Sequence, residues 1–165
     1  MITFEPMGEE TFQRYCEQAI RAYAEDHIRG GRWTPDEAYE KSAEEFRTLL
    51  PQGVATPDHF IYDLVEGEGR QAVGVLWLNT QQRGGELQVF IYEVEIYEPF
   101  RRRGYAAQAF ALLDDWARER GASAIRLHVF GHNHAARALY EKAGYEPTNI
   151  QMIKRLDAKA APIPS

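Results

Sequence analysis

Residues 94–107 read VEIYEPFRRRGYAA and join the end of an apolar strand to the start of an amphipathic helix. Pro99 follows the strand, and Gly104 and Ala106 fall in the first turn of the helix. The first amides of a helix have no partner inside it and carry the positive end of its dipole, so they attract anions. Gly104 and Ala106 are small enough to let a pyrophosphate approach the backbone, and the arginines at 101–103 add positive charge. The stretch therefore predicts a phosphate-binding turn.

The turn alone does not identify its ligand. Its spacing differs from the glycine pattern of dinucleotide-binding folds, and it lacks the Lys-Ser/Thr pair of a P-loop. A solvent-exposed basic loop is the alternative that the local sequence leaves open.

On both sides of this turn, apolar spacing and turn residues predict further elements. The predicted strands cover 2–5, 59–66, 72–79, 86–97, 124–130 and 145–156, and the predicted helices cover 9–28, 34–50, 104–120 and 133–143. Tight turns favour antiparallel pairing of the middle strands, whereas the later strand–helix–strand requires a parallel crossover. The prediction is an α/β single domain over 1–156, with a mixed, mostly antiparallel central sheet flanked by helices, and a flexible tail over 157–165.

Two motifs resemble one known family. Arg101-x-x-Gly104-x-Ala106 after a strand and Pro99 is similar to the pyrophosphate signature of the GNAT acetyltransferases. Residues 133–145, NHAARALYEKAGY, resemble the second motif of that family. Both motifs come in the family's order with a strand between them. The resemblance implies a GNAT-like fold and an N-acetyltransferase that uses acetyl-CoA as co-substrate, without a metal.

The resemblance also implies how acetyl-CoA would bind. The backbone of Val94, Glu95 and Ile96 would pair with the pantetheine arm and the thioester carbonyl, and amides from 102–107 would hold the pyrophosphate. Asn133 would contact the coenzyme in addition to capping its helix. The complete set of implied coenzyme-binding residues is Val94, Glu95, Ile96, Arg101, Arg102, Arg103, Gly104, Tyr105, Ala106, Ala107 and Asn133.

Tyr140 is the predicted proton donor to the departing thiolate. The pKa of a phenol is near 10, so the group is protonated at neutral pH and can donate a proton to sulfur. The resemblance implies that this tyrosine lies beside the thioester. A core-facing tyrosine is the alternative reading.

The general base has two candidates, Glu93 and His128. An amine with a pKa near 10.4 is almost entirely charged at pH 7, so a base must accept its proton. Strict alternation along strand 89–97 places Glu93 and Glu95 on the face of Val89 and Ile91, where a carboxylate is costly unless it is paired or functional.

Family members leave the choice of base open. Glu93 resembles acidic residues of some polyamine acetyltransferases, and His128 lies where ribosomal-protein acetyltransferases carry a catalytic glutamate. The glutamate that several members carry one residue before Glu93 is Tyr92 here. An ion pair of Glu93, or a structural role of His128, remains open.

Composition excludes several other classes. The formal net charge of −6 argues against nucleic-acid binding. Cys16 is the only cysteine, so the chain has no intrachain disulfide and no cysteine-based metal cage. The histidines at 128, 132 and 134 do not have zinc-site spacing, and acetyl transfer needs no metal. We find neither a signal peptide nor a membrane-spanning run, and expect a cytoplasmic protein without membrane partners.

The acceptor is the least determined part of the prediction. We expect a primary amine of a small molecule or a peptide amino group, bound by the first two helices and their loop. Tyr23, Asp26, His27 and Trp33 are candidates by location only. The resemblance also allows a homodimer. Two other functions stay open: a non-catalytic acyl-CoA-binding sensor with a GNAT fold, and a nucleotide-phosphate enzyme of another fold.

Overall fold

The computed structural model describes residues 1–156 as nine helices and strands with two short 3₁₀ turns. The predicted tail at 157–165 lies outside the described residues. The strands are β1 (Ile2–Pro6), β2 (His59–Glu66), β3 (Gln71–Arg83), β4 (Glu86–Ile96) and β5 (Ala124–Leu127). The helices are α1 (Glu9–Arg29), α2 (Pro35–Leu49), α3 (Tyr105–Glu119) and α4 (His134–Lys142), and the 3₁₀ turns are η1 (Gly53–Ala55) and η2 (Glu98–Phe100).

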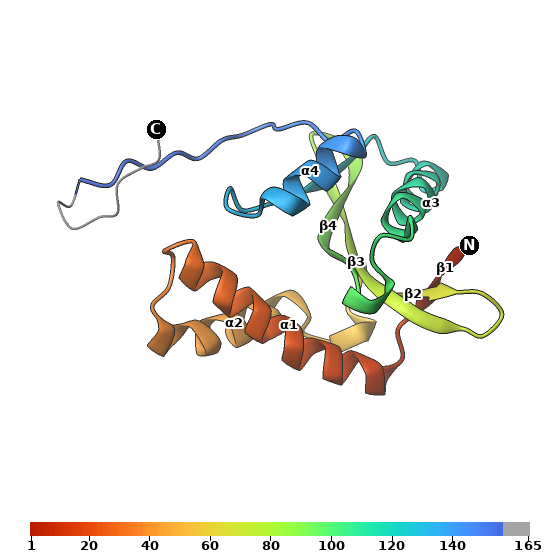
Figure 1. Cartoon of the computed structure of the whole chain (residues 1–165), viewed down its shortest axis with the longest axis horizontal. Coiled ribbons are helices and arrows are strands. Elements are labelled where there is room, and N and C mark those ends of the chain that lie inside the picture. Colours follow the sequence, from red (N-terminus) through yellow and green to blue (C-terminus); the bar gives the residue numbers. More distant parts are fainter. Residues whose placement is uncertain (157–165) are drawn as a thin grey trace.

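The strands form one sheet in the order β1-β2-β3-β4-β5, which follows the chain. Figure 1 shows α1 and α2 on one side of the labelled strands and α3 and α4 on the other. Each pair from β1 to β4 is antiparallel. β4 and β5 pair in parallel, because α3 crosses over the sheet between them. The predicted mixed, mostly antiparallel sheet is therefore confirmed.

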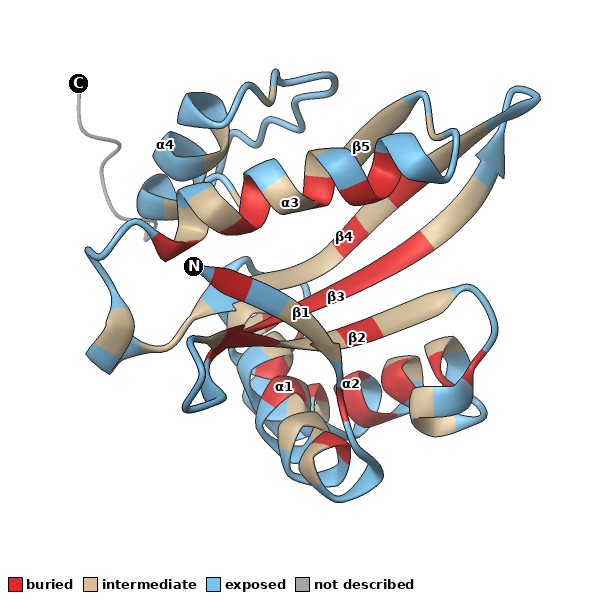
Figure 2. Cartoon of the chain, turned by 90° about the vertical axis from the view of Figure 1, so that its right-hand side faces the viewer, coloured by how far each residue is buried: buried red, intermediate tan, exposed pale blue. Residues whose placement is uncertain are grey.

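Helices cover both faces of this sheet (Figure 2). α3 packs on one face, where Phe110 and Leu113 meet Leu76 and Leu78 of β3. α1 and α2 pack on the other face, and their aromatic side chains surround Trp77. No helix within residues 1–156 has the length and apolarity that crossing a membrane requires.

A β-bulge at Tyr92 interrupts the alternation of β4. Trp77 lies opposite Glu93 and Leu78 lies opposite Ile91, so Tyr92 is an extra residue without a partner in β3. A one-residue bulge moves every later side chain to the other face of the sheet. Ile91 therefore packs under α3, whereas Glu93 faces α1. The expectation that Glu93 and Glu95 share the face of Val89 and Ile91 is wrong for this reason.

The predicted last strand at 145–156 is also wrong. These residues leave α4 as an extended segment that pairs with no described strand (Figure 1). A sequence can favour the extended conformation without having an edge to pair with inside its own chain. The predicted strand at 124–130 is shorter than expected and ends at Leu127.

Candidate active site

The pairing of β4 with β5 ends at the bulge, and a groove lies along the edge of β4 beyond it. Their pairing covers only Gln88–Ile91 against Ala124–Leu127. Beyond it, the segment from Val94 to Ile96 pairs with β3 alone, so its other edge is open. A groove of about 880 Å³ lies along this edge, between β4, α3 and α4.

The first turn of α3 lines the groove. Arg102 (φ 63°) and Gly104 (φ 80°) have left-handed backbone conformations, which turn successive N–H groups outward. None of the backbone N–H groups from Arg102 to Ala107 donates a hydrogen bond to a described residue; the first to do so is that of Gln108, which donates to the Gly104 carbonyl at 3.2 Å. A row of unpaired amides at a helix N-terminus fits a diphosphate.

Every predicted coenzyme-binding residue except Arg103 lines the groove. The three consecutive arginines differ in what their side chains contact. Arg101 donates from Nε to the Ile96 carbonyl at 2.9 Å and lies 3.6 Å from Glu95 through Nη2. Arg103 donates to the Pro99 carbonyl at 3.2 Å. Arg102 lines the groove and has no side-chain hydrogen bond with residues 1–156, so its guanidinium is available to an anion.

α4 forms the opposite wall of the groove. The side chain of Asn133 accepts a hydrogen bond from the Ala136 amide at 3.2 Å, which confirms its capping role. Asn133 also lines the groove together with Ala136 and Leu139. Its side-chain amide can therefore donate to a ligand while its oxygen caps the helix.

Tyr140 lies on α4 but, unlike Ala136 and Ala143 of the same helix, is not among the residues that line the groove or the pocket described below. It shares a helix face with Ala136 and Ala143, which line the groove, and its ring packs edge-on to Phe110 at 6.0 Å. Burial raises the pKa of the Tyr140 phenol, and the negative charge of Glu93 raises it further. The hydroxyl donates to no described residue, so it can donate to a ligand.

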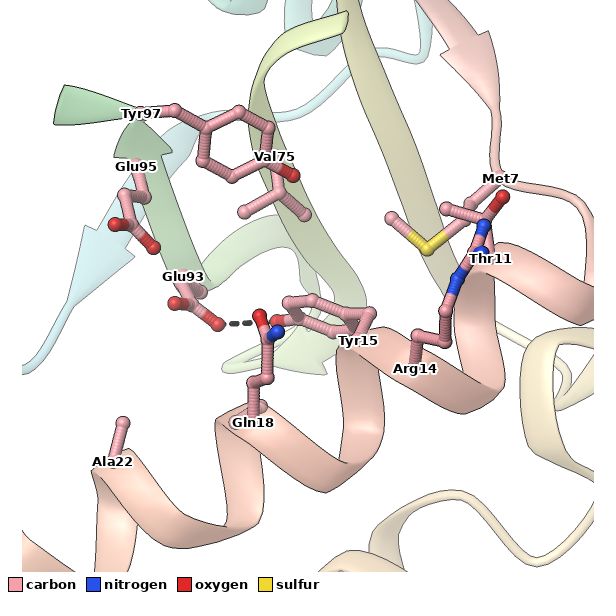
Figure 3. Close-up of a pocket in the computed structure, with 11 residues that line it drawn as sticks. Met7, Thr11, Arg14, Tyr15, Gln18, Ala22, Val75, Glu93, Glu95 and Tyr97 are labelled. Carbon is pink, nitrogen blue, oxygen red and sulfur yellow. Dashed lines mark hydrogen bonds between the residues drawn. The ribbon is translucent and has the colours of Figure 1, made fainter. Parts of the chain in front are cut away.

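A second, smaller pocket of about 290 Å³ lies on the α1 side of β4 (Figure 3). Glu93 and Glu95 project into it from β4, Tyr97 lines it just after that strand, and Tyr15 and Gln18 project from α1. Glu95 lines both this pocket and the groove. The segment of β4 that follows the bulge therefore forms a wall that the two spaces share.

Glu93 is the titratable group at this junction. The Tyr15 hydroxyl donates a hydrogen bond to its Oε2 (Figure 3). Burial raises the pKa of Glu93 to about 7; the hydrogen bond from Tyr15 lowers it, and the charges of Glu95 and Asp26 raise it. A carboxyl with this pKa exchanges protons readily at neutral pH, as a general base must.

His128, the other predicted base, lies just after the end of β5. Its side chain is exposed, its ring packs edge-on to Phe130 at 5.1 Å, and it lines neither the groove nor the pocket. Glu93 and Tyr140, in contrast, are close enough for the charge of one to act on the pKa of the other.

The residues that the sequence suggested for the acceptor site, Tyr23, Asp26, His27 and Trp33, line neither the groove nor the smaller pocket. His27 and Trp33 are buried, with ring centroids 4.3 Å apart, and Tyr23 packs against both rings. These rings line neither space, so they belong to the packing between α1 and α2. Asp26 acts on the site only through its charge.

Sequence reasoning missed Arg14, Tyr15 and Tyr97, which line the smaller pocket. Tyr15 belongs to the apolar stripe of the first helix and looks like a core residue. The sequence does show a tyrosine on a helix and a glutamate in an otherwise apolar strand. Their pairing could be predicted only if the face of the strand on which Glu93 lies were already known.

The comparisons with known proteins agree with this architecture. Residues 16–145 match the model of the acetyltransferase (GNAT) family. The chain is 40% identical to the uncharacterized N-acetyltransferase YycN of Bacillus subtilis, over 94% of this chain and 99% of the relative. It is 38% identical to the uncharacterized N-acetyltransferase YdgE of the same organism, over 93% and 98%.

Solved structures show the same fold. The crystal structure of YycN superposes with a TM-score of 0.88 over 94% of this chain and 99% of that one. AAC(6')-Iy, solved with the bisubstrate analog CoA-S-monomethyl-acetylneamine, is 15% identical with a TM-score of 0.60, over 96% and 99% of the two chains. From its family match and its close similarity to YycN, the chain belongs to the GNAT family of acetyltransferases.

Proposed function

We propose that this protein transfers an acetyl group from acetyl-CoA to a primary amine by direct attack of the amine on the thioester. The observation that carries the proposal is that two different spaces share a wall at β4. One is a groove lined by unpaired amides, and the other is a small pocket with glutamates on its wall. Glu95 lines both.

The groove would hold the coenzyme. The amides from Arg102 to Ala107 and the guanidinium of Arg102 would bind its diphosphate. The open edge of β4 from Val94 to Ile96 would pair with the amide groups of the pantetheine arm, as an added strand does. AAC(6')-Iy, which shares the fold, binds a bisubstrate analog that contains CoA.

The chain's own residues would handle the protons of the transfer. The amine would enter from the smaller pocket, where Glu93, directly or through a water molecule, accepts the proton that the nitrogen loses. As the carbon–nitrogen bond forms and the carbon–sulfur bond breaks, Tyr140 would donate a proton to the thiolate. An ammonium acceptor loses two protons on becoming an amide. Glu93 passes the first to solvent, and the second, carried by water, restores the phenol of Tyr140, so the enzyme is unchanged and one proton is released in net. The coenzyme supplies the activated acetyl group.

The acidic pocket supports a cationic amine as acceptor. Glu93 and Glu95 attract the ammonium form, and Glu93 then takes up its proton. A small molecule or a peptide amino group would meet this requirement. His128 lines neither space, so we assign the base to Glu93.

A non-catalytic acyl-CoA sensor would need the groove but neither Glu93 nor Tyr140. Calorimetry with CoA, acetyl-CoA and ATP, followed by thiol-release assays over a panel of amines, separates the two functions. We expect CoA to bind in preference to ATP, and acetyl-CoA to release thiol only when an amine is present. Preference for ATP would overturn the proposal, and CoA binding without thiol release from any amine would favour the sensor.

A further inference from the structure

The smaller pocket carries opposite charges at two places. Glu93 and Glu95 lie on the β4 wall, and Arg14 projects from α1 beside Met7 and Thr11 (Figure 3). Arg14 is the only basic residue among those that line the pocket. Its guanidinium forms no ion pair or hydrogen bond with any residue of the described range 1–156.

The spacing on α1 makes the pocket long in one direction. Arg14, Gln18 and Ala22 all line it, and they follow one another at intervals of four residues. Such residues share one helix face and are separated by about 6 Å per step. Figure 3 shows the guanidinium directed toward Met7 and Thr11, away from Glu93. A bound molecule would therefore meet positive charge at one end and negative charge farther along.

Resting on the proposed function, we infer that the acceptor is a small molecule with a primary amine and, several bonds away, a carboxylate or phosphate group. Arg14 binds the anionic group, and Glu93 and Glu95 receive the amine. A guanidinium is suited to either anion, because both accept paired N–H donors. A pocket of about 290 Å³ lies at the small end of the range for ligand sites. A diamine would place its second cation near Arg14, which opposes binding.

Matched acceptors test this inference in the thiol-release assay. The set pairs ω-amino acids with their methyl amides and ω-aminoalkyl phosphates with the corresponding amino alcohols, and adds diamines of equal length. We expect kcat/KM for at least one anionic series to exceed that of its neutral partner by about tenfold or more, the size of one charge-assisted contact. The carboxylate and phosphate series distinguish the two anions.

The variant Arg14→Gln should abolish this preference, because kcat/KM for the anionic acceptors falls to that of their neutral partners, mainly through KM. Arg21→Gln is the matched control, because Arg21 is an exposed arginine on α1 outside the pocket. Equal use of charged and neutral acceptors, better use of diamines, or an unchanged preference in Arg14→Gln would overturn the inference. Absence of thiol release with every amine would overturn the proposed function, and with it this inference.

Discussion

Tyr15 on α1 donates a hydrogen bond to Glu93 on β4, and this contact joins the first helix to the strand that follows the bulge. Burial raises the pKa of Glu93 to about 7, and the bond from Tyr15 opposes that rise because it stabilises the charged form. Tyr15 therefore helps to keep Glu93 partly ionised at neutral pH.

Tyr15→Phe should move the activity profile to higher pH. Without the phenol, the pKa of Glu93 rises, since burial and the charges of Glu95 and Asp26 still favour the protonated form. We expect the acidic limb of kcat/KM against pH to shift to higher pH. Tyr23→Phe, which removes a phenol bonded to Glu45 instead, is the control. A limb that stays in place, or moves to lower pH, would contradict this role of Tyr15.

Glu93→Gln should lower activity and raise stability at alkaline pH. The folded pKa of Glu93 is near 7 and its ordinary value is 4.5, so the folded state holds a proton that the unfolded state has lost between these values. Stability from this group is complete below about pH 4.5 and declines as pH rises through about 7. Glutamine removes that decline and can still accept from Tyr15.

The expected gain is about 1 kcal/mol, discounted from the full pKa shift because Glu93 is only partly buried. It corresponds to about 2 to 4 °C in Tm for a chain of this size. Melting curves of the wild type and the variant should differ at about pH 8 and converge at about pH 4, while kcat falls about a hundredfold or more. A variant less stable at alkaline pH would contradict the assignment.

Part of the site was predictable from the sequence, because its pieces are local. The amides before Gln108 are exposed by a turn that Gly104 and Pro99 define within a few residues, and the cap of Asn133 spans three residues. Such features depend on short-range geometry that residue types specify directly.

The remaining features of the site and of the fold depend on contacts that the alternation of apolar and polar residues along a strand cannot reveal. The bulge at Tyr92 turns Glu93 toward α1, and nothing in the apolar pattern of the strand marks the extra residue. Ile150 and Met152 have the spacing of a strand, but they pair with no described strand, although β5 ends the sheet. Register and partner choice are properties of the assembled sheet.

Tyr140→Phe should slow the chemical step without weakening coenzyme binding. Burial and the charge of Glu93 raise the pKa of the phenol, so it is protonated throughout the neutral range. Its loss removes a proton donor but little packing, because the ring against Phe110 remains. We expect kcat to fall about tenfold to a hundredfold, with the calorimetric Kd for CoA unchanged. Equal turnover by the variant would remove Tyr140 from the mechanism.

Gly74→Ala should destabilise the strand that separates the two spaces. Gly74 lies opposite Ile96, and a Cβ there would come within 2.2 Å of the Glu95 carbonyl oxygen. Because that neighbour is backbone, β4 must move, at a cost of about 1 to 3 kcal/mol. Gly69→Ala, where a Cβ meets nothing within 4 Å, is the control. We expect a lower Tm and weaker CoA binding for Gly74→Ala alone, and equal melting curves would contradict this packing.

Gly104→Ala tests the phosphate-binding turn, and a glycine at the other end of the same helix, Gly121, provides the matched control. Gly104 precedes α3 with φ 80° and Gly121 follows it with φ 74°, and a Cβ at either position meets nothing within 4 Å. Both alanine variants should therefore lose about 1 kcal/mol of stability from the left-handed backbone. Only at Gly104 would the new methyl group stand where a diphosphate approaches the amides. We expect the Kd for CoA, measured by calorimetry, to rise about tenfold in Gly104→Ala and to stay constant in Gly121→Ala. If the two variants bind CoA equally well, the diphosphate does not lie on this turn, because the shared backbone strain is the only effect that the substitutions would then have.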